Sequence, residues 1–314
     1  MKDWLVSKLI CPACPVAQAP LELVVRDARL NDVWDGELNC TTCGNRYPIQ
    51  QGVAVLLPSK MFSILDDKGG YNTPGMLSAY LWSHFCDLFD DPGATDAYRH
   101  WMAHLQPSDG DALDVGCAVG RLSFELARTH SRVVGIDISM PFIRKAREIL
   151  LNRRLDFKLI VEGHVTETRR FDFDEQWDFD HIDFIVADAL ALPFRQHEFS
   201  TVAAINILEK VPDPIKHLME VNRMLARNRS SFLFSDPFSW DETSSPKERW
   251  LGGNGNDRYC ARGIDTLRQM FAGEHGVFDP PLAIEGCGDI NWKIRKTENL
   301  WEHITSQFLV GRRS

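Results

Sequence analysis

The chain has 314 residues, a net charge of −9 and a hydrophobic share of 44%, which together indicate one large globular domain with a smaller module. The acidic balance argues against a broad nucleic-acid-binding face, which would have to be basic, although it leaves room for a local basic patch. No apolar run resembles a signal peptide or is long enough to cross a membrane, so we expect a reduced, cytoplasmic protein with no membrane partner.

Two Cys-x-x-Cys pairs lie near the N-terminus: Cys11, Cys14, Cys40 and Cys43. Each pair directs two thiolates at one centre, and two pairs complete a tetrahedral zinc site. Gly44 follows the second pair, where the turn needs a residue that tolerates positive φ. The stretches LELVV, ELNC, RYPI and GVAVLLP predict strands, so residues 1–60 are expected to form a zinc ribbon. Four cysteines close the coordination shell, which predicts a structural ion; a redox role for each pair is the alternative.

The stretch CTTCGNRYPIQQGVAVLLP resembles the second half of the small zinc-ribbon proteins that bind and stabilise methyltransferases acting on tRNA and on translation factors. The positions that carry this resemblance are Cys40, Cys43, Gly44, Tyr47, Pro48, Ile49, Gly52, Leu57 and Pro58. The resemblance implies that an activator module is here fused to its methyltransferase. Residues 61–110 are then expected to be a linker with entry helices, and residues 111–314 the methyltransferase domain.

A nucleotide-binding loop is predicted by DALDVGCAVGRLSFELA, which begins at residue 111 with an apolar strand and continues into a glycine-containing turn and an amphipathic helix. Glycines let the backbone approach a ligand, and the N-terminus of the helix faces it. The next strands end at Asp137 and Asp188, and a carboxylate about twenty residues after such a loop can accept hydrogen bonds from both ribose hydroxyls. A dinucleotide-dependent dehydrogenase is the rival interpretation, but it favours GxGxxG. A helix-capping role for Asp137 is the alternative without a ligand.

This order of motifs resembles class I S-adenosylmethionine-dependent methyltransferases. The resemblance implies an α/β fold with a doubly wound, Rossmann-like sheet of seven strands. The first motif of that family matches Asp114, Gly116 and Gly120, with Ala118 in place of its middle glycine. The cofactor-binding residues that the resemblance implies are Tyr80, Asp114, Gly116, Cys117, Gly120, Asp137, Ile138, Asp188, Ala189 and Asn206.

Segments in the rest of the chain resemble the methyltransferase domain of ovothiol-synthesising enzymes, which methylates an imidazole nitrogen of a thiol-bearing histidine. The segments are YLWSHF at 80–85, PFSW at 237–240, SP at 245–246, WLGG at 250–253 and IRKT at 294–297. The resemblance spans about residues 70–314 and implies a small imidazole acceptor such as a thiohistidine. The added ribbon and the missing iron-dependent sulfur-transfer domain depart from the family.

Methyl transfer is an in-line displacement, so the protein mainly has to align the nucleophile with the methyl group. A neutral imidazole nitrogen is already nucleophilic, and a nearby carboxylate can fix its tautomer. The catalytic candidates are Asn206, Glu209 and Asp236, and the substrate-binding candidates are Arg295, Trp240, Trp250, Tyr71 and His84. Each has a purely structural alternative: a solvated charge for Glu209, a turn cap for Asp236, a surface salt bridge for Arg295, and packing for the aromatic residues.

The insert at residues 155–184 alternates in a way that predicts a hairpin, with His164 exposed at its turn and a solvated acidic run from Asp172 to Asp183. Two other functions stay open. One is an RNA or protein methyltransferase whose ribbon aids docking, and the other is a non-catalytic scaffold that steadies a partner enzyme. The acidic charge and the tail segments favour a small-molecule acceptor, and the intact first motif argues against a scaffold.

Overall fold

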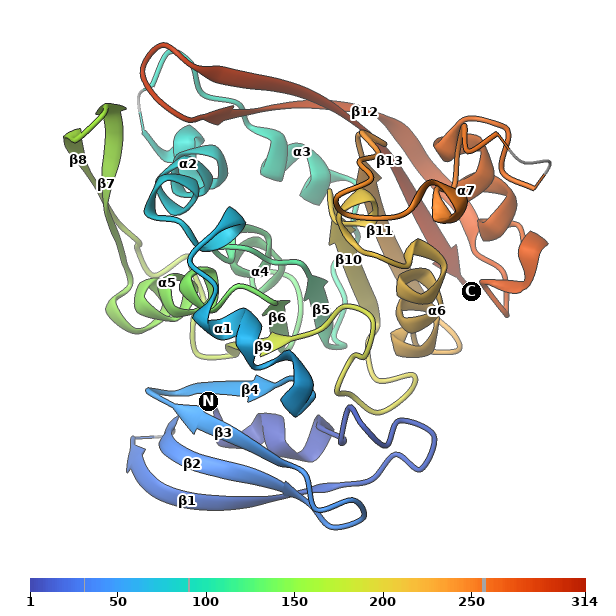
Figure 1. The fold of residues 1–314 in the computed structure, drawn as a ribbon, viewed down its shortest axis with the longest axis horizontal. Coiled ribbons are helices and arrows are strands. Elements are labelled where there is room, and N and C mark those ends of the chain that lie inside the picture. The colour runs from blue at the N-terminus through green and yellow to red at the C-terminus, as the bar shows by residue number, and fades with distance from the viewer. Residues whose placement is uncertain (31, 90, 256–257) are drawn as a thin grey trace.

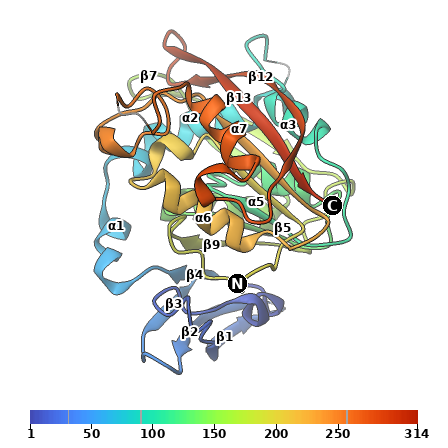
Figure 2. The same ribbon diagram turned by 90° about the vertical axis from the view of Figure 1, so that its right-hand side faces the viewer.

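The computed structural model describes residues 1–30, 32–89, 91–255 and 258–314. Within this described chain, eleven strands form one mixed sheet in the order β1-β2-β3-β4-β9-β6-β5-β10-β11-β13-β12. Helices cover both faces of its central part, and the N-terminal ribbon extends from one edge (Figure 1). Figure 2 shows the ribbon projecting beyond the main body.

The strands of the ribbon are β1 (Leu21–Arg29), β2 (Asp32–Cys40), β3 (Arg46–Gln50) and β4 (Val53–Leu56). The remaining strands of the large sheet are β5 (Ala112–Val115), β6 (Val133–Asp137), β9 (Ile182–Ala187), β10 (Thr201–Ile205), β11 (Ser230–Asp236), β12 (Ala283–Arg295) and β13 (Trp301–Arg313). The α-helices are α1 (Ser63–Asp66), α2 (Pro74–Phe85), α3 (Ala97–Ala103), α4 (Arg121–Leu126), α5 (Met140–Asn152), α6 (Pro214–Met224) and α7 (Gly263–Phe271). The 3₁₀ helices are η1 (Asp3–Lys8), η2 (Ser59–Met61), η3 (Gly70–Asn72), η4 (Cys86–Leu88), η5 (Leu208–Lys210), η6 (Lys247–Arg249) and η7 (Glu274–Gly276).

The central strands run parallel in the order β9-β6-β5-β10-β11, and β13 lies antiparallel between β11 and β12. This is the strand order of the class I methyltransferase fold, so the predicted α/β architecture is confirmed. The order in which strands are added to the sheet changes side at β5: β6 and β9 follow on one side of it, and β10 and β11 on the other. Such a switch point opens a crevice at the carboxyl ends of the strands, and ligands bind there.

Successive side chains of the central strands enter two separate cores, because they point to opposite faces. In β5, Leu113 and Val115 pack into the core that contains α6 and α7, while Ala112 packs into the core that contains α2 to α5. Both faces are therefore covered by helices. This explains why β9, with the sequence IDFIVA, is buried along its whole length instead of alternating between buried and exposed.

The ribbon joins the central sheet edge to edge through β4, which pairs antiparallel with β3 and parallel with β9. The ribbon thus extends the sheet at its edge and does not pack on one of its faces. The physical reason is that all four residues of β4 are buried apolar side chains, which suits a strand covered on both faces. The exposed edge that β9 would otherwise present is thereby paired.

A buried ionic cluster lies beside this junction. Arg147 of α5 donates a 2.9 Å hydrogen bond to Asp32 of β2 and a second one to Asp183 of β9. The expectation that Asp183 belongs to a solvated acidic face is wrong, because its side chain is fully buried against Arg147. The acidic run gave no sign that Asp183 has a cationic partner 36 residues away, on helix α5.

The predicted insert forms an antiparallel hairpin of β7 (Arg154–Glu162) and β8 (Val165–Asp172), with His164 exposed at its turn. The predicted entry helix is α2. Thr73 accepts a hydrogen bond from the backbone N–H of Met76 and Pro74 follows it, so the helix has an oxygen cap and a proline at its first position. None of the helices in the described part of the chain has the length and apolar character needed to cross a membrane.

Candidate active site

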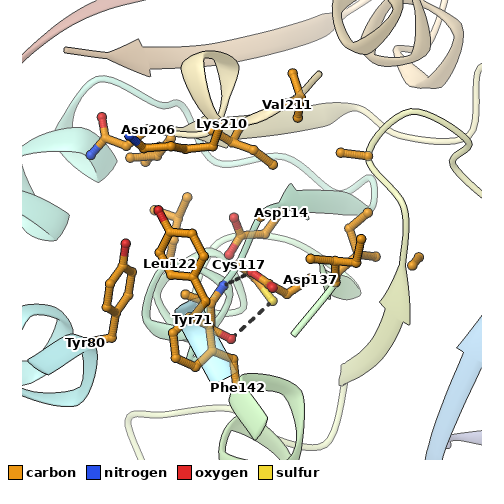
Figure 3. A pocket seen from close by; sticks show the side chains of 18 of the residues that line it. Tyr71, Tyr80, Asp114, Cys117, Leu122, Asp137, Phe142, Asn206, Lys210 and Val211 are labelled. Carbon is orange, nitrogen blue, oxygen red and sulfur yellow. Dashed lines mark hydrogen bonds between the residues drawn. The ribbon is translucent and has the colours of Figure 1, made fainter. Parts of the chain in front are cut away.

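A pocket of about 240 Å³ lies at the switch point, at the carboxyl ends of β5, β6, β9 and β10 (Figure 3). Residues from all four strand ends and from α2 contribute side chains to it. The sequence-predicted residues that line it are Tyr71, Tyr80, His84, Asp114, Gly116, Cys117, Asp137, Ile138, Asp188, Ala189 and Asn206. The structure thus brings together residues that are up to 135 positions apart in the chain.

The turn after β5 has the backbone geometry that its glycines permit. Gly116 has a φ of +76°, and a Cβ atom there would lie 2.6 Å from the side chain of Ile207. Ala118, which replaces the expected middle glycine, also adopts a left-handed φ of 46°. Gly120 does not line the pocket; a Cβ there would lie 2.7 Å from the ring of Phe184. Gly120 therefore allows α4 to pack closely on β9.

Two carboxylates line the pocket at the ends of β5 and β6: Asp114 is buried, and Asp137 is half-buried. Asp137 accepts hydrogen bonds from the backbone N–H of Ala118 (3.0 Å, drawn in Figure 3) and from that of Ser139 (2.8 Å). Burial raises the pKa of Asp137 to about 6. Asp114 accepts a 2.7 Å hydrogen bond from the hydroxyl of Ser123, and burial raises its pKa to about 7. A cationic ligand would stabilise both ionised groups.

Asn206 follows β10 directly and has a φ of 55°, which is uncommon for a residue other than glycine. Its backbone N–H donates a 2.6 Å hydrogen bond to the carbonyl of Ser235 on β11, which holds this conformation. Its side-chain carbonyl oxygen is buried and has no hydrogen-bond partner among the residues that the structure describes. An acceptor without a partner on a pocket wall fits a ligand that supplies a hydrogen-bond donor.

Aromatic side chains form one wall of the pocket. The ring of Tyr80 lies 5.7 Å from that of Tyr71 and 5.0 Å from that of Phe142. The hydroxyl of Tyr98 lies 2.9 Å from Nε2 of His84. Burial, aided by the charge of Arg121, lowers the pKa of His84 to about 3, so this imidazole is neutral at physiological pH.

The sequence did not indicate four polar or aromatic residues that line the pocket: Tyr98, Phe142, Lys210 and Trp292. Tyr98 lies on α3 and Trp292 on β12, and neither lies in a motif that points to a ligand. Lys210 lies four residues after Asn206, in the segment NILEKV. This closeness to a predicted site residue was the one feature of the sequence that could have placed Lys210 at the pocket.

The lining fits S-adenosylmethionine. Asp137 lines the pocket at the end of β6, and Asp188, which accepts a hydrogen bond from the N–H of Leu190, lines it after the end of β9. The carboxylates of Asp114, Asp137 and Asp188 outnumber the one lysine among the described residues that line the pocket. A ligand that carries a sulfonium and an ammonium group would balance this excess of negative charge.

Two catalytic candidates lie behind the pocket wall instead of in it. Asp236, at the end of β11, accepts hydrogen bonds from the backbone N–H of Glu209 (3.3 Å) and of Phe238 (2.8 Å). Both residues are nearly inaccessible, and burial together with the charge of Glu209 raises the pKa of Asp236 to about 8. This arrangement matches the turn cap that we considered for Asp236.

Three substrate-binding candidates lie away from the pocket. Trp240 and Trp250 stack on each other, with ring centroids 6.2 Å apart and an interplanar angle of 14°. Arg295 lines a separate surface cavity beside the tip of the β7–β8 hairpin. Its guanidinium lies over the ring of Trp301, and one terminal nitrogen is 3.7 Å from Asp91. The roles that we assigned to these residues stay predictions.

The four cysteines of the ribbon form the expected cluster. Their sulfur atoms all lie within 4.8 Å of one another, and those of Cys11 and Cys43 are 3.7 Å apart. Zinc–sulfur bonds of about 2.3 Å in a tetrahedron require sulfur atoms roughly 3.8 Å apart, so the cluster fits zinc. Gly44 has the predicted positive φ, and the Tyr47 hydroxyl lies 3.1 Å from the Cys11 sulfur. Four protein ligands leave no open position, so the ion would be structural.

Comparison with known proteins agrees with this picture. Residues 113–231 match the family model described as Methyltransferase domain. A stretch of 80 residues is 38% identical to the Cypemycin N-terminal methyltransferase of a Streptomyces species, and it covers 25% of this chain and 30% of that relative.

Two solved structures show similar chains at low identity. One is in a complex that contains the Haloferax volcanii Trm112 methyltransferase activator, with 15% identity, a TM-score of 0.45, and 76% of this chain and 97% of that chain covered. The other is the Haemonchus contortus Phosphoethanolamine N-methyltransferase 2 in complex with S-adenosyl-L-methionine, with 16% identity, a TM-score of 0.46, and 78% and 48% covered. Residues 113–231, which match the family model, are therefore similar to a methyltransferase domain.

Proposed function

We propose that the protein is an S-adenosylmethionine-dependent methyltransferase that N-methylates a small imidazole such as a thiohistidine. The observation that carries the methyltransferase part is the pocket at the switch point, where Asp114, Asp137, Asp188 and Asn206 converge from four strand ends. The match of residues 113–231 to a methyltransferase domain supports the same reaction class.

S-adenosylmethionine supplies a methyl group on a positively charged sulfur. The chain's own residues bind and orient the reactants. Asp137 accepts hydrogen bonds from the ribose hydroxyls of the cofactor. The positive φ of Gly116 lets the cofactor approach the backbone of the turn after β5 closely. The unpartnered carbonyl oxygen of Asn206 accepts a hydrogen bond from the ligand. Alignment of this kind contributes on the order of 7–11 kcal/mol to such a displacement.

The aromatic wall supports a flat, neutral acceptor. Tyr80, Tyr98 and Trp292 offer ring surfaces, and His84 is neutral, so the wall does not repel a protonated or a neutral imidazole. Within the described residues, the ligand-facing surface is a small pocket of about 240 Å³, which favours a small molecule over RNA or protein. The resemblance of the tail segments to ovothiol-synthesising enzymes points to a thiohistidine, and a cytoplasmic location belongs to the same proposal.

The test is methyl transfer from labelled S-adenosylmethionine to 5-thiohistidine, with L-histidine, bulk tRNA, ribosomal RNA and a protein extract in parallel. We expect label in 5-thiohistidine alone. Label in RNA or protein would favour the macromolecular alternative and would make the ribbon a docking module. Binding of S-adenosylmethionine without transfer to any of these would contradict the imidazole acceptor. Absence of binding would favour a non-catalytic scaffold.

We also infer that the zinc ribbon stabilises the methyltransferase domain to which it is fused. The continuous pairing of β3, β4 and β9 and the ion pairs of Arg147 with Asp32 and Asp183 support this inference. Cys40→Ser tests it through zinc content and melting temperature. We expect both to fall, and an unchanged melting temperature after zinc loss would contradict the inference.

A further inference from the structure

Lys210 is the one lysine or arginine among the described residues that line the pocket. It ends the short helix η5, directly after β10 and four residues beyond Asn206. Figure 3 shows Lys210 and Asn206 along one edge of the pocket, across from Tyr71 and Tyr80. Its side chain is 37% exposed, so the ammonium group is accessible to a ligand that enters the pocket.

A buried carboxylate fixes the position of this ammonium. Nζ of Lys210 lies 2.8 Å from Oε1 of Glu209, whose side chain is only 3% exposed. Burial lowers the pKa of Lys210, but the hydrogen bond and the charge of Glu209 raise it above its ordinary value, so the group stays protonated. The backbone of Glu209 is tied in turn to Asp236. An ammonium has three N–H donors, and the contact with Glu209 uses one of them.

We propose that Lys210 binds a carboxylate of the methyl acceptor and so selects an amino acid over its decarboxylated amine. This inference rests on the proposed function. The other charged residues that line the pocket are Asp114, Asp137 and Asp188, which repel an acceptor carboxylate from their side of the pocket. Arg295, the cationic residue among the substrate-binding candidates from the sequence, lines a different cavity.

The methionine part of the cofactor carries a carboxylate too, so the same ammonium has a second possible ligand. The position of Lys210 favours the acceptor. Lys210 follows β10, whereas the glycine turn and Asp137 follow β5 and β6 on the other side of the switch point. S-adenosylhomocysteine retains the cofactor's carboxylate, so its affinity for a Lys210 variant separates the two ligands.

The experiment compares Lys210→Met with Lys216→Met, a matched control in which an exposed lysine of α6 outside the pocket is changed in the same way. Calorimetry measures binding of S-adenosylhomocysteine alone, then of 5-thiohistidine and of its decarboxylated amine to the enzyme saturated with S-adenosylhomocysteine. Steady-state kinetics with both acceptors give KM and kcat separately.

We expect Lys210→Met to weaken binding of 5-thiohistidine and raise its KM roughly 10- to 100-fold, the range for loss of one charge-assisted hydrogen bond. Binding of the decarboxylated amine and of S-adenosylhomocysteine should stay unchanged, Lys210→Arg should restore most of the loss, and Lys216→Met should behave as wild type. Equal weakening for the acid and the amine, weakened S-adenosylhomocysteine binding, or no effect would each overturn the inference.

Failure of the proposed function gives a different result, because wild-type protein would then bind no S-adenosylhomocysteine or transfer no methyl group. Lys210→Met leaves the buried carboxylate of Glu209 without its cation and so risks unfolding. If its melting temperature falls below the assay range, Lys210→Met combined with Glu209→Gln removes both charges and is measured in the same way. The double variant should also bind 5-thiohistidine more weakly than wild type does, with no change for the decarboxylated amine. Equal affinity of wild type for 5-thiohistidine and for the amine would overturn the inference without any variant.

Discussion

Arg147→Met should destabilise the whole chain, because it leaves two buried carboxylates without their shared cation. Arg147 and Asp183 have almost no exposed surface, and Asp32 is 8% exposed on its side chain. Removing one partner of a buried ion pair costs about 3–5 kcal/mol. Asp183 keeps hydrogen bonds from the backbone N–H groups of Lys2 and Phe184, which favours the lower end of that range.

A loss of about 3 kcal/mol corresponds to a melting temperature lower by roughly 4–5 °C in a chain of 314 residues. The assay is thermal and urea unfolding of Arg147→Met beside Arg144→Met, which removes an exposed arginine one turn earlier on α5. The control should stay within about 0.5 kcal/mol of wild type. Equal stability of the two variants would refute the view that the ionic cluster couples the ribbon to the methyltransferase sheet.

The same cluster gives a pH dependence. Burial raises the pKa of Asp32, but the charge and hydrogen bond of Arg147, together with the charges of the Met1 ammonium and Lys2, lower it, and the net pKa lies below the ordinary value. A carboxyl group whose pKa is lowered by folding stabilises the protein above its unfolded-state pKa, and this contribution disappears as pH falls through the folded-state pKa. As the pH falls below the ordinary pKa of an aspartate, wild type should therefore lose more unfolding free energy than Arg147→Met does. Parallel curves of unfolding free energy against pH would contradict the view that Arg147 lowers the pKa of Asp32.

Three further predictions concern the pocket and the ribbon. Asp137→Asn should weaken S-adenosylmethionine binding roughly 10-fold or more. Wild type should lose affinity as the pH falls through about 6, and the variant should not show this loss when both are measured by calorimetry between pH 5 and pH 8. The same pH profile in both proteins would contradict ribose binding by this carboxylate. Gly120→Ala should lower the melting temperature by several degrees, because the added Cβ meets the ring of Phe184 at a left-handed φ, and an unchanged melting temperature would show that the turn relaxes freely. Chelation of zinc should lower the melting temperature of wild type and leave that of Cys40→Ser unaffected, as measured by fluorescence-monitored unfolding; an equal response would contradict a four-cysteine site.

The sequence was sufficient to predict the pocket where a local pattern carried the information. Asp137 and Asp188 end apolar strands, and the carboxyl ends of parallel strands meet at one edge of a sheet, so their convergence follows from strand order. The two cysteine pairs likewise have a local spacing that specifies a metal site. Gly116 was predictable because its turn permits only a residue without a side chain.

Residues whose placement depends on long-range packing were not predictable in the same way. Arg295 belongs to a tail segment with a family resemblance, yet the β12–β13 hairpin carries it to a different cavity. Lys210 and Trp292 reach the pocket because η5 and β12 pack around it, and no spacing rule links them to the glycine turn. The pairing of β4 with β9 joins segments about 130 residues apart, and no local pattern of β4 identifies its parallel partner.

The measurement that tests the account most directly is calorimetric titration of the purified protein with S-adenosylmethionine, with Asp137→Asn titrated beside it. We predict saturable binding of one equivalent to wild type, competition by S-adenosylhomocysteine and much weaker binding to the variant. Absence of binding to folded, zinc-loaded wild-type protein, or equal binding to both proteins, would contradict the claim that the switch-point pocket is a cofactor site.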